Sequence, residues 1–237
     1  MTAAAHRFPS TCWTVIRDAQ QGGVGVRAAA LERLLSTYWR PVYWTLRLDW
    51  SESPESARDH AQSYFASFLE RDLLQDVAAE RGRFRSYVKT TLKHWMLNQR
   101  RDQAAVKRGG GVRIVALDDL DPVEADPPAR DLSPEQRFER ELMRAIVDQA
   151  MTELRAELEA AGHGDRFTLF ARFHGFDEAD HDASYQALTR EFGLGAHDVK
   201  NQLARTRARF RDLVLAHLRD GLSSEADLVA EIRAVFG

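Results

Sequence analysis

The sequence predicts an all-α protein with two small helical domains joined by a flexible linker. Through most of the 237 residues, apolar side chains recur at intervals of three and four, which is the period of an amphipathic helix. Residues 109–134 interrupt this pattern, because they are rich in Gly, Pro and Asp and show no sustained helical period. Hydrophobic residues make up 44% and charged residues 29% of the chain, a composition typical of globular proteins with apolar cores.

The predicted N-terminal domain covers residues 1–108. Its second helix begins near Val26, is kinked or restarted by Pro41, and then resumes its apolar pattern. The stretch Ser53-Pro54-Glu55 is typical of a helix start, with proline just inside the cap. The apolar faces indicate helices at residues 12–20, from 26 past 41, at 56–71 and at 84–101.

The predicted C-terminal domain covers residues 135–220, and a last amphipathic helix covers residues 221–237. Ser184 is expected to cap a short helix, Gly193 to form a turn, and a longer helix to begin near Ala196. This is a helix-turn-helix arrangement, whose second helix can lie in the major groove of DNA. The residues expected on the buried face of that helix are Val199, Leu203, Thr206, Phe210 and Leu213.

The other helices of this domain are predicted at residues 134–161 and 166–173. The first of them has an apolar stripe with helical spacing. Its members are Phe138, Leu142, Ile146, Ala150 and Leu154.

Charge is strongly segregated along the chain, although the formal net charge is only -3. Residues 81–113 hold ten Lys or Arg and one acid, and residues 114–135 hold seven acids and one base. Residues 199–219 hold six bases and one acid. Two basic blocks separated by an acidic one indicate two anion-binding surfaces and a solvated connector.

The sequence argues against an enzyme, and we expect no catalytic residue, no cofactor and no metal. The single cysteine, Cys12, excludes an internal disulfide and any site with several cysteine ligands. Acids and histidines gather between His174 and Asp182, but a solvated acidic loop is favoured there because no ligand spacing is fixed. No nucleophile elbow, phosphate-binding glycine loop or zinc spacing is found in the sequence.

The chain opens without a cationic and apolar leader, and no apolar run is long enough to span a bilayer. We therefore expect a cytoplasmic protein without membrane insertion.

Two parts of the chain resemble the sigma-70 family of RNA polymerase sigma factors. Residues 184–194 (SYQALTREFGL), with the arginines that follow Leu203, are similar to the family's C-terminal DNA-binding region. Residues 57–65 (ARDHAQSYF) are similar to its polymerase-binding helix, and residues 84–101 to its promoter-melting helix. The order and spacing of these parts also fit the family.

The segments FPSTCW at residues 8–13 and RGRFRSY at residues 81–87 resemble the extracytoplasmic-function group, in particular sigma factors with a short C-terminal extension. The resemblance covers roughly residues 31–213. It implies a protein that binds core RNA polymerase, recognises promoter DNA and promotes transcription initiation, with an anti-sigma factor as the further partner usual in the family. Regulation by the C-terminal extension at residues 221–237 is the alternative to an anti-sigma factor. The alternative function is that of a stand-alone helix-turn-helix regulator that acts without polymerase.

The second helix of the helix-turn-helix carries candidates for promoter recognition on its outward side. Residues near the start of such a helix reach base edges, and arginines farther along contact phosphates. We therefore expect His197, Lys200 and Asn201 to read the minus-thirty-five element and Arg205 to contact the backbone. The four arginines at alternate positions up to Arg211 cannot all face DNA, because residues two apart on a helix are turned by about 200°.

The helix at residues 84–101 combines aromatic and cationic side chains, as the capture of unstacked promoter bases requires. For Trp95 the competing interpretation is burial in the core, and Lys107 and Arg108 are expected on phosphates. The candidate DNA-binding residues of this region are His94, Trp95, Asn98, Gln99, Arg100, Arg101, Lys107 and Arg108.

A polar face precedes this helix. Asp59 and Gln62 lie three residues apart and therefore share one side of their helix. By the resemblance, they contact the coiled-coil clamp of the polymerase's largest subunit together with Ser63 and Phe65. Without the resemblance they form an ordinary polar surface.

Overall fold

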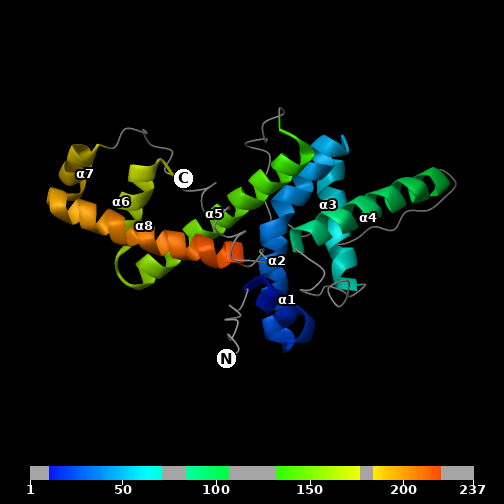
Figure 1. Ribbon diagram of the computed structural model, residues 1–237, viewed down its shortest axis with the longest axis horizontal. Helices are drawn as coiled ribbons and strands as arrows, with labels where there is room; N and C mark the ends of the chain where they lie inside the picture. The colour runs from blue at the N-terminus through cyan, green and yellow to red at the C-terminus, as the bar shows by residue number, and fades with distance from the viewer. Residues whose placement is uncertain (1–10, 71–83, 107–131, 177–183, 220–237) are drawn as a thin grey trace, which may run out of the picture. The chain divides into compact units, whose positions relative to one another are not determined.

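The structure, a computed structural model, describes residues 11–70, 84–106, 132–176 and 184–219. Every regular element in these ranges is a helix, so the all-α prediction is confirmed for them (Figure 1). The elements are α1 (Thr11–Gln21), α2 (Val24–Trp44), the π-helix η1 (Thr45–Asp49), α3 (Pro54–Glu70), α4 (Phe84–Val106), α5 (Pro134–Ala160), α6 (Gly164–His174), α7 (Tyr185–Phe192) and α8 (Ala196–Arg219).

Contacts divide the chain into two compact units. The N-terminal unit includes α1 to α4 and the beginning of α5, up to Ala145, and the C-terminal unit runs from Ile146 to His217. The first turns of α5, which the sequence assigned to the second domain from residue 135, are therefore grouped with the N-terminal unit. Most of the predicted linker and the predicted helix at residues 221–237 lie outside the described residues.

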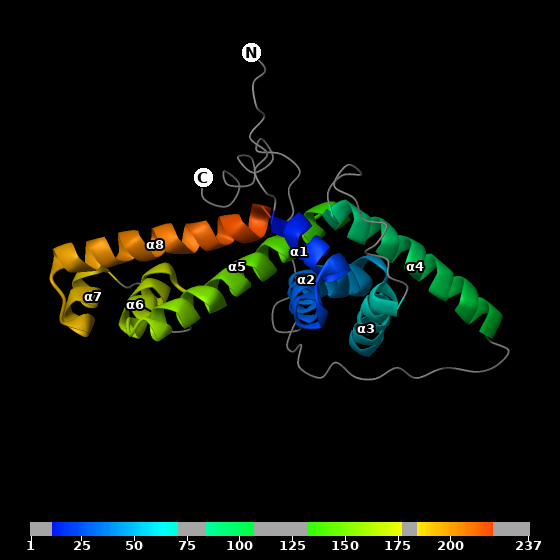
Figure 2. The same cartoon turned by 90° about the horizontal axis from the view of Figure 1, so that it is seen from below.

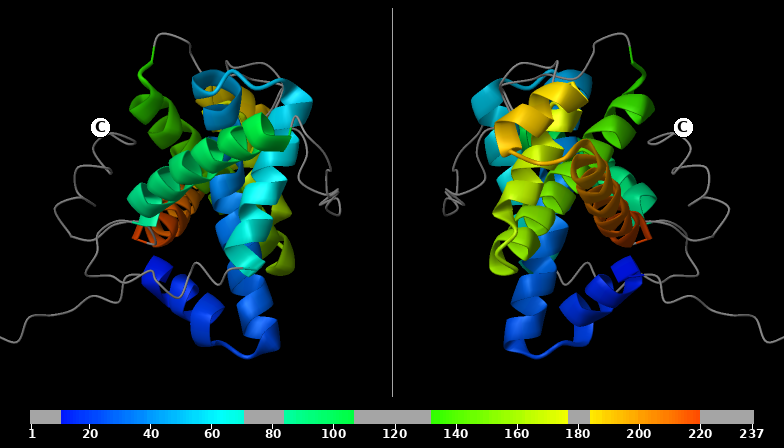
Figure 3. Two further views of the ribbon diagram at one scale, coloured as in Figure 1. Left: turned by 90° about the vertical axis from the view of Figure 1, so that its right-hand side faces the viewer. Right: turned by 90° about the vertical axis from the view of Figure 1, so that its left-hand side faces the viewer.

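Aromatic side chains fill the core of the N-terminal unit. In this unit α1 folds back against α2, and α2 lies beside α3 (Figure 3). Tyr38 of α2 meets Phe84 of α4 edge to face, with ring centroids 5.2 Å apart, and Trp39 stacks on Phe65 of α3 at 6.0 Å. These are the geometries that aromatic pairs prefer, and they connect α2 to both following helices.

Pro41 lies inside α2 and does not restart it. The helix continues to Trp44, and the wider turn of η1 follows directly. The hydroxyl of Thr45 donates a hydrogen bond to the carbonyl of Pro41 at 2.8 Å. The irregular turn therefore comes after the proline, where the chain leaves α2 and approaches α3.

The C-terminal unit packs α6, α7 and α8 with the second part of α5 (Figure 2). Phe170 of α6 and Phe210 of α8 lie with ring centroids 5.4 Å apart in its core. The apolar stripe predicted for α5 is buried along its whole length. The buried face predicted for α8 is also confirmed, since Val199, Leu203, Thr206, Phe210 and Leu213 are all buried.

No helix among the described residues is both long enough and apolar enough to cross a membrane.

Candidate nucleic-acid interface

Helices α7 and α8 are joined by a tight turn from Gly193 to Gly195. Ser184 caps α7 as predicted, because its hydroxyl accepts a hydrogen bond from the amide of Ala187 at 3.2 Å. Gly193 has a φ of 63°, the left-handed conformation that favours glycine after a helix. The amide of Val199 donates to the carbonyl of Gly195 at 3.0 Å and closes the first turn of α8.

Four sequence-predicted residues lie together on the exposed side of the first three turns of α8: His197, Lys200, Asn201 and Arg205. The opposite side of the same turns is buried in the C-terminal unit. Within the described part of the chain, none of the four side chains makes a hydrogen bond or ion pair with another residue. Two cations, an amide and an imidazole are therefore available to an acceptor-rich partner such as phosphates and base edges.

The arginines of α8 divide as the helical period requires. The guanidinium of Arg209 forms a two-pronged contact with Glu157 of α5, and its Nε donates to Glu157 Oε2 at 2.8 Å. This hydrogen bonding lowers the pKa of Glu157 and raises the pKa of Arg209. On the other flank, Nη2 of Arg207 lies 3.4 Å from Nε2 of His174 on α6. Arg205 and Arg211 are both exposed and continue the outward side of the first turns.

A second exposed face lies on α4. His94, Asn98 and Arg101 occupy positions i, i+4 and i+7, so they share one side of the helix. All three are exposed, and their side chains have no hydrogen-bonding or ionic partner among the residues that the structure describes. Leu97 lies on the same side and is 39% exposed. The face thus combines an apolar side chain with donors, as contact with bases and phosphates requires.

The other candidates on α4 are placed differently. Trp95 and Gln99 are half-buried, and the ring of Trp95 contacts α3. Arg100 is exposed, but its guanidinium lies 4.7 Å over the ring of Trp50 and donates to the carbonyl of that residue at 2.9 Å. Neighbours on a helix are turned by about 100°, so Arg100 and Arg101 do not act as one pair.

The surface predicted to contact polymerase lies on α3. Asp59 is exposed, and Gln62 and Ser63, three and four residues farther along, are half-buried beside it. Phe65 is only 6% exposed and stacks on Trp39, so its side chain supports α3 from the core. The surface that α3 offers to a partner is therefore Asp59, Gln62 and Ser63.

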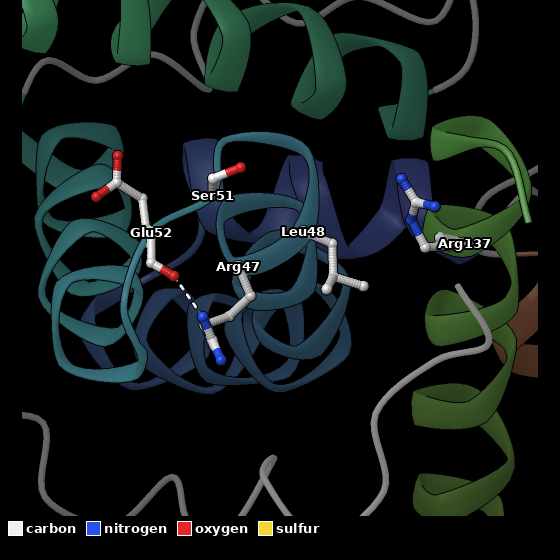
Figure 4. A pocket seen from close by; sticks show the side chains of 5 residues that line it. All are labelled: Arg47, Leu48, Ser51, Glu52 and Arg137. Atoms are coloured by element: carbon white, nitrogen blue, oxygen red, sulfur yellow. Dashed lines mark hydrogen bonds between the residues drawn. The ribbon is translucent and has the colours of Figure 1, made fainter. Parts of the chain in front are cut away.

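A polar pocket of about 460 Å³ beside η1 was not foreseen from the sequence (Figure 4). Arg47 donates to the carbonyl of Glu52, whose carboxylate points away from Arg47 and lies 3.8 Å from Arg100. Across the pocket, Arg137 of α5 pairs with Asp49. Nη1 of Arg47 and the guanidinium of Arg137 have partners, whereas the buried Nε of Arg47 has none among the described residues. The lining of the pocket comes from Arg47, Leu48, Ser51, Glu52 and Arg137.

Two candidates, Lys107 and Arg108, lie outside the described residues, as does most of the acidic loop between His174 and Asp182. In the ranges that are described, no group of three His, Cys, Asp or Glu side chains is close enough to hold a metal ion.

No family model, no curated protein and no solved structure matches this chain.

Proposed function

We propose that this chain is a sigma factor of the extracytoplasmic-function type, which binds core RNA polymerase, recognises promoter DNA and promotes transcription initiation. The observation that carries the proposal is the pair of exposed helix faces rich in donors, one on α4 and one on α8. The side chains that form these two faces have no hydrogen-bonding or ionic partner among the described residues. A sigma factor needs two such faces because a promoter presents two separate elements.

The face on α8 fits the recognition of a duplex. A helix in the major groove reads bases with side chains near its N-terminus, and His197, Lys200 and Asn201 all lie in its first two turns. Asn is a natural partner for adenine, because its amide can donate to N7 and accept from N6. Arg205, one turn farther along, is placed for a phosphate.

The face on α4 fits opened DNA. His94 and Leu97 offer flat or apolar surface to an unstacked base, and Asn98 and Arg101 offer donors to the strand beside it. Trp95 is half-buried at the edge of this face, where it connects α4 to α3. In this role α4 opens the minus-ten element while α8 holds minus-thirty-five.

The proposal also includes two protein partners and a cellular location. Core RNA polymerase binds the surface of Asp59, Gln62 and Ser63 on α3, in the cytoplasm, and an anti-sigma factor restrains the protein. No enzymatic activity is part of it.

Selection of random duplex DNA tests the function directly, with the chain alone and with bacterial core RNA polymerase added. With polymerase, the enriched sites should contain two different elements at a fixed spacing. Asn201→Ala should weaken the preference for one base of the upstream element, a loss of about 1–3 kcal/mol at that position. Arg205→Ala should weaken binding to all sites alike and reduce the salt dependence.

Arg166→Ala, on α6 of the same unit, removes a cation that does not lie on the α8 face and serves as the matched control. Enrichment of palindromic half-sites by the chain alone would instead identify a stand-alone dimeric regulator.

A further inference from the structure

A second row of cations lies on α4, on a different side from His94 and Arg101. Arg85, Lys89 and Lys93 recur at every fourth position, so their side chains form one line along the helix. Successive members are about 6 Å apart along the axis. The spacing is visible in the sequence, but only the fold shows what faces it.

Acids of α5 cover most of this row. Glu139 accepts a hydrogen bond from Arg85 Nη1 at 2.6 Å, and its other oxygen lies 3.5 Å from Lys89 Nζ. Lys89 also donates to Glu135 at 3.1 Å. Lys93, the outermost member, is exposed and pairs with none of the described residues. Two acids one helical turn apart thus match two cations one turn apart.

Contacts beside the row position α5 for this match. Phe138, between the two acids in sequence, is buried, and Lys89 lies 5.5 Å over its ring. Arg137 pairs with Asp49, and Glu141 pairs with Arg40. The beginning of α5 therefore rests on the N-terminal unit through charge pairs around a single aromatic anchor.

We propose that Lys89 and Lys93 form a phosphate-binding surface for duplex nucleic acid, and that Glu135 and Glu139 of α5 occupy Lys89 in its absence. Arg85 is only 7% exposed and holds Glu139 at the buried end of the row. The acids and the nucleic-acid backbone are alternative occupants of Lys89. The inference deepens the proposed function by adding a masked DNA contact to α4, but its evidence is the pairing of α4 with α5.

Replacement of the acids by phosphates costs little free energy at the exposed end of the row. The side chain of Glu135 is 76% exposed and that of Lys89 is 27% exposed, so their ion pair is solvated and screened and holds α5 only weakly. A phosphate backbone brings a denser line of negative charge and releases counterions when it binds. The contact of Lys89 with Glu135 is therefore one that a polyanion can displace, whereas the buried Arg85 stays paired with Glu139.

The test measures the affinity of the chain for a nonspecific duplex of about 20 base pairs. Fluorescence anisotropy gives this affinity at salt concentrations from about 50 to 200 mM. Glu135→Gln/Glu139→Gln should bind at least about threefold tighter than the unaltered chain at the lowest salt. Its slope of log K against log salt should steepen by about one to two, because each phosphate neutralised contributes about 0.9. Glu32→Gln/Glu159→Gln removes the same charge at exposed positions away from the row and is the control.

Adding Lys89→Gln/Lys93→Gln to the acid-neutralised variant should remove the gain. Equal affinity of the acid-neutralised variant and the control would overturn the proposal, as would a gain that survives the loss of both lysines. If circular dichroism shows that the double acid variant does not fold, Glu135→Gln alone, at the exposed position, gives the same comparison. No polymerase is present, so failure here is read separately from failure of the sigma-factor proposal.

Discussion

At the scale of single residues, a buried hydroxyl fixes how α3 and α4 meet. Tyr64 is 0% exposed, and its hydroxyl donates to the carbonyl of Val88 at 3.1 Å. The same hydroxyl lies 2.8 Å from the hydroxyl of Thr91. Burial raises the pKa of Tyr64 far above its ordinary value, so the hydroxyl keeps its proton and remains a donor. One residue thus connects the helix proposed to contact polymerase with the helix proposed to open DNA.

Tyr64→Phe should destabilise the N-terminal unit by about 1 kcal/mol, because the carbonyl of Val88 loses a buried partner while the ring stays in place. Urea unfolding measures the change. Tyr185→Phe, whose parent side chain is 45% exposed on α7, should leave stability within about 0.5 kcal/mol of the unaltered chain. Equal losses in both variants would contradict the role given to the Tyr64 hydroxyl.

His174 makes the C-terminal unit sensitive to acid. Partial desolvation of its ring, and next the charge of Arg207, lower the pKa of His174 below its ordinary value of 6.5, although the residue remains exposed. Between the folded and unfolded pKa values the unfolded chain binds more protons, so stability is complete above about pH 6.5 and is lost as the pH falls below it.

The melting temperature should therefore fall more between about pH 7.5 and 5.5 in the unaltered protein than in His174→Gln. His163→Gln, at an exposed position before α6, should keep the full pH dependence. Identical pH profiles for the unaltered protein and His174→Gln would show that this imidazole does not carry the effect.

At the scale of elements, the sequence predicted each helix better than the contacts between helices. The buried stripe of α8 was predicted residue by residue, because a 3.6-residue period is a local property of the chain. On the same grounds the outward positions His197 and Asn201 could be identified. The partner of Arg100 could not, since Trp50 lies 50 residues away and only the fold brings the two together.

The packing of the first turns of α5 within the N-terminal unit is the contact that the sequence predicted least well. The carboxylate of Glu141 is 1% exposed and pairs with Arg40 of α2, 101 residues away. A Gly- and Pro-rich stretch precedes α5, and on that ground the sequence predicts that the whole helix belongs to the second domain. The sequence does not indicate which cations the acids in the first turns of α5 contact, because those cations lie far away along the chain.

Arg40→Met should cost the N-terminal unit about 3–5 kcal/mol, because it leaves the carboxylate of Glu141 buried without a cation. Arg40→Met/Glu141→Leu should recover most of that loss, since no buried charge remains. Thermal unfolding of the two variants provides the comparison. A double variant as unstable as the single one would mean that the loss comes from packing and not from the stranded charge.

At the scale of the whole molecule, the proposed function divides promoter recognition between the two units. The N-terminal unit offers an acidic and polar surface on α3 and a donor-rich face on α4, and the C-terminal unit offers the exposed start of α8. A sigma factor must bind RNA polymerase, and in the proposed function α3 makes that contact. The sigma-factor proposal therefore depends above all on polymerase binding.

Gel filtration with active core RNA polymerase of a matched bacterial species tests that claim most directly. Three proteins are compared: the unaltered chain, Asp59→Ala/Gln62→Ala, and Glu32→Ala, which changes an exposed acid on α2 as a control. We expect the unaltered chain and the control to elute with polymerase and the double variant to do so more weakly. Failure of the unaltered chain to elute with active core enzyme would rule out the sigma-factor proposal and favour a DNA-binding regulator that works alone.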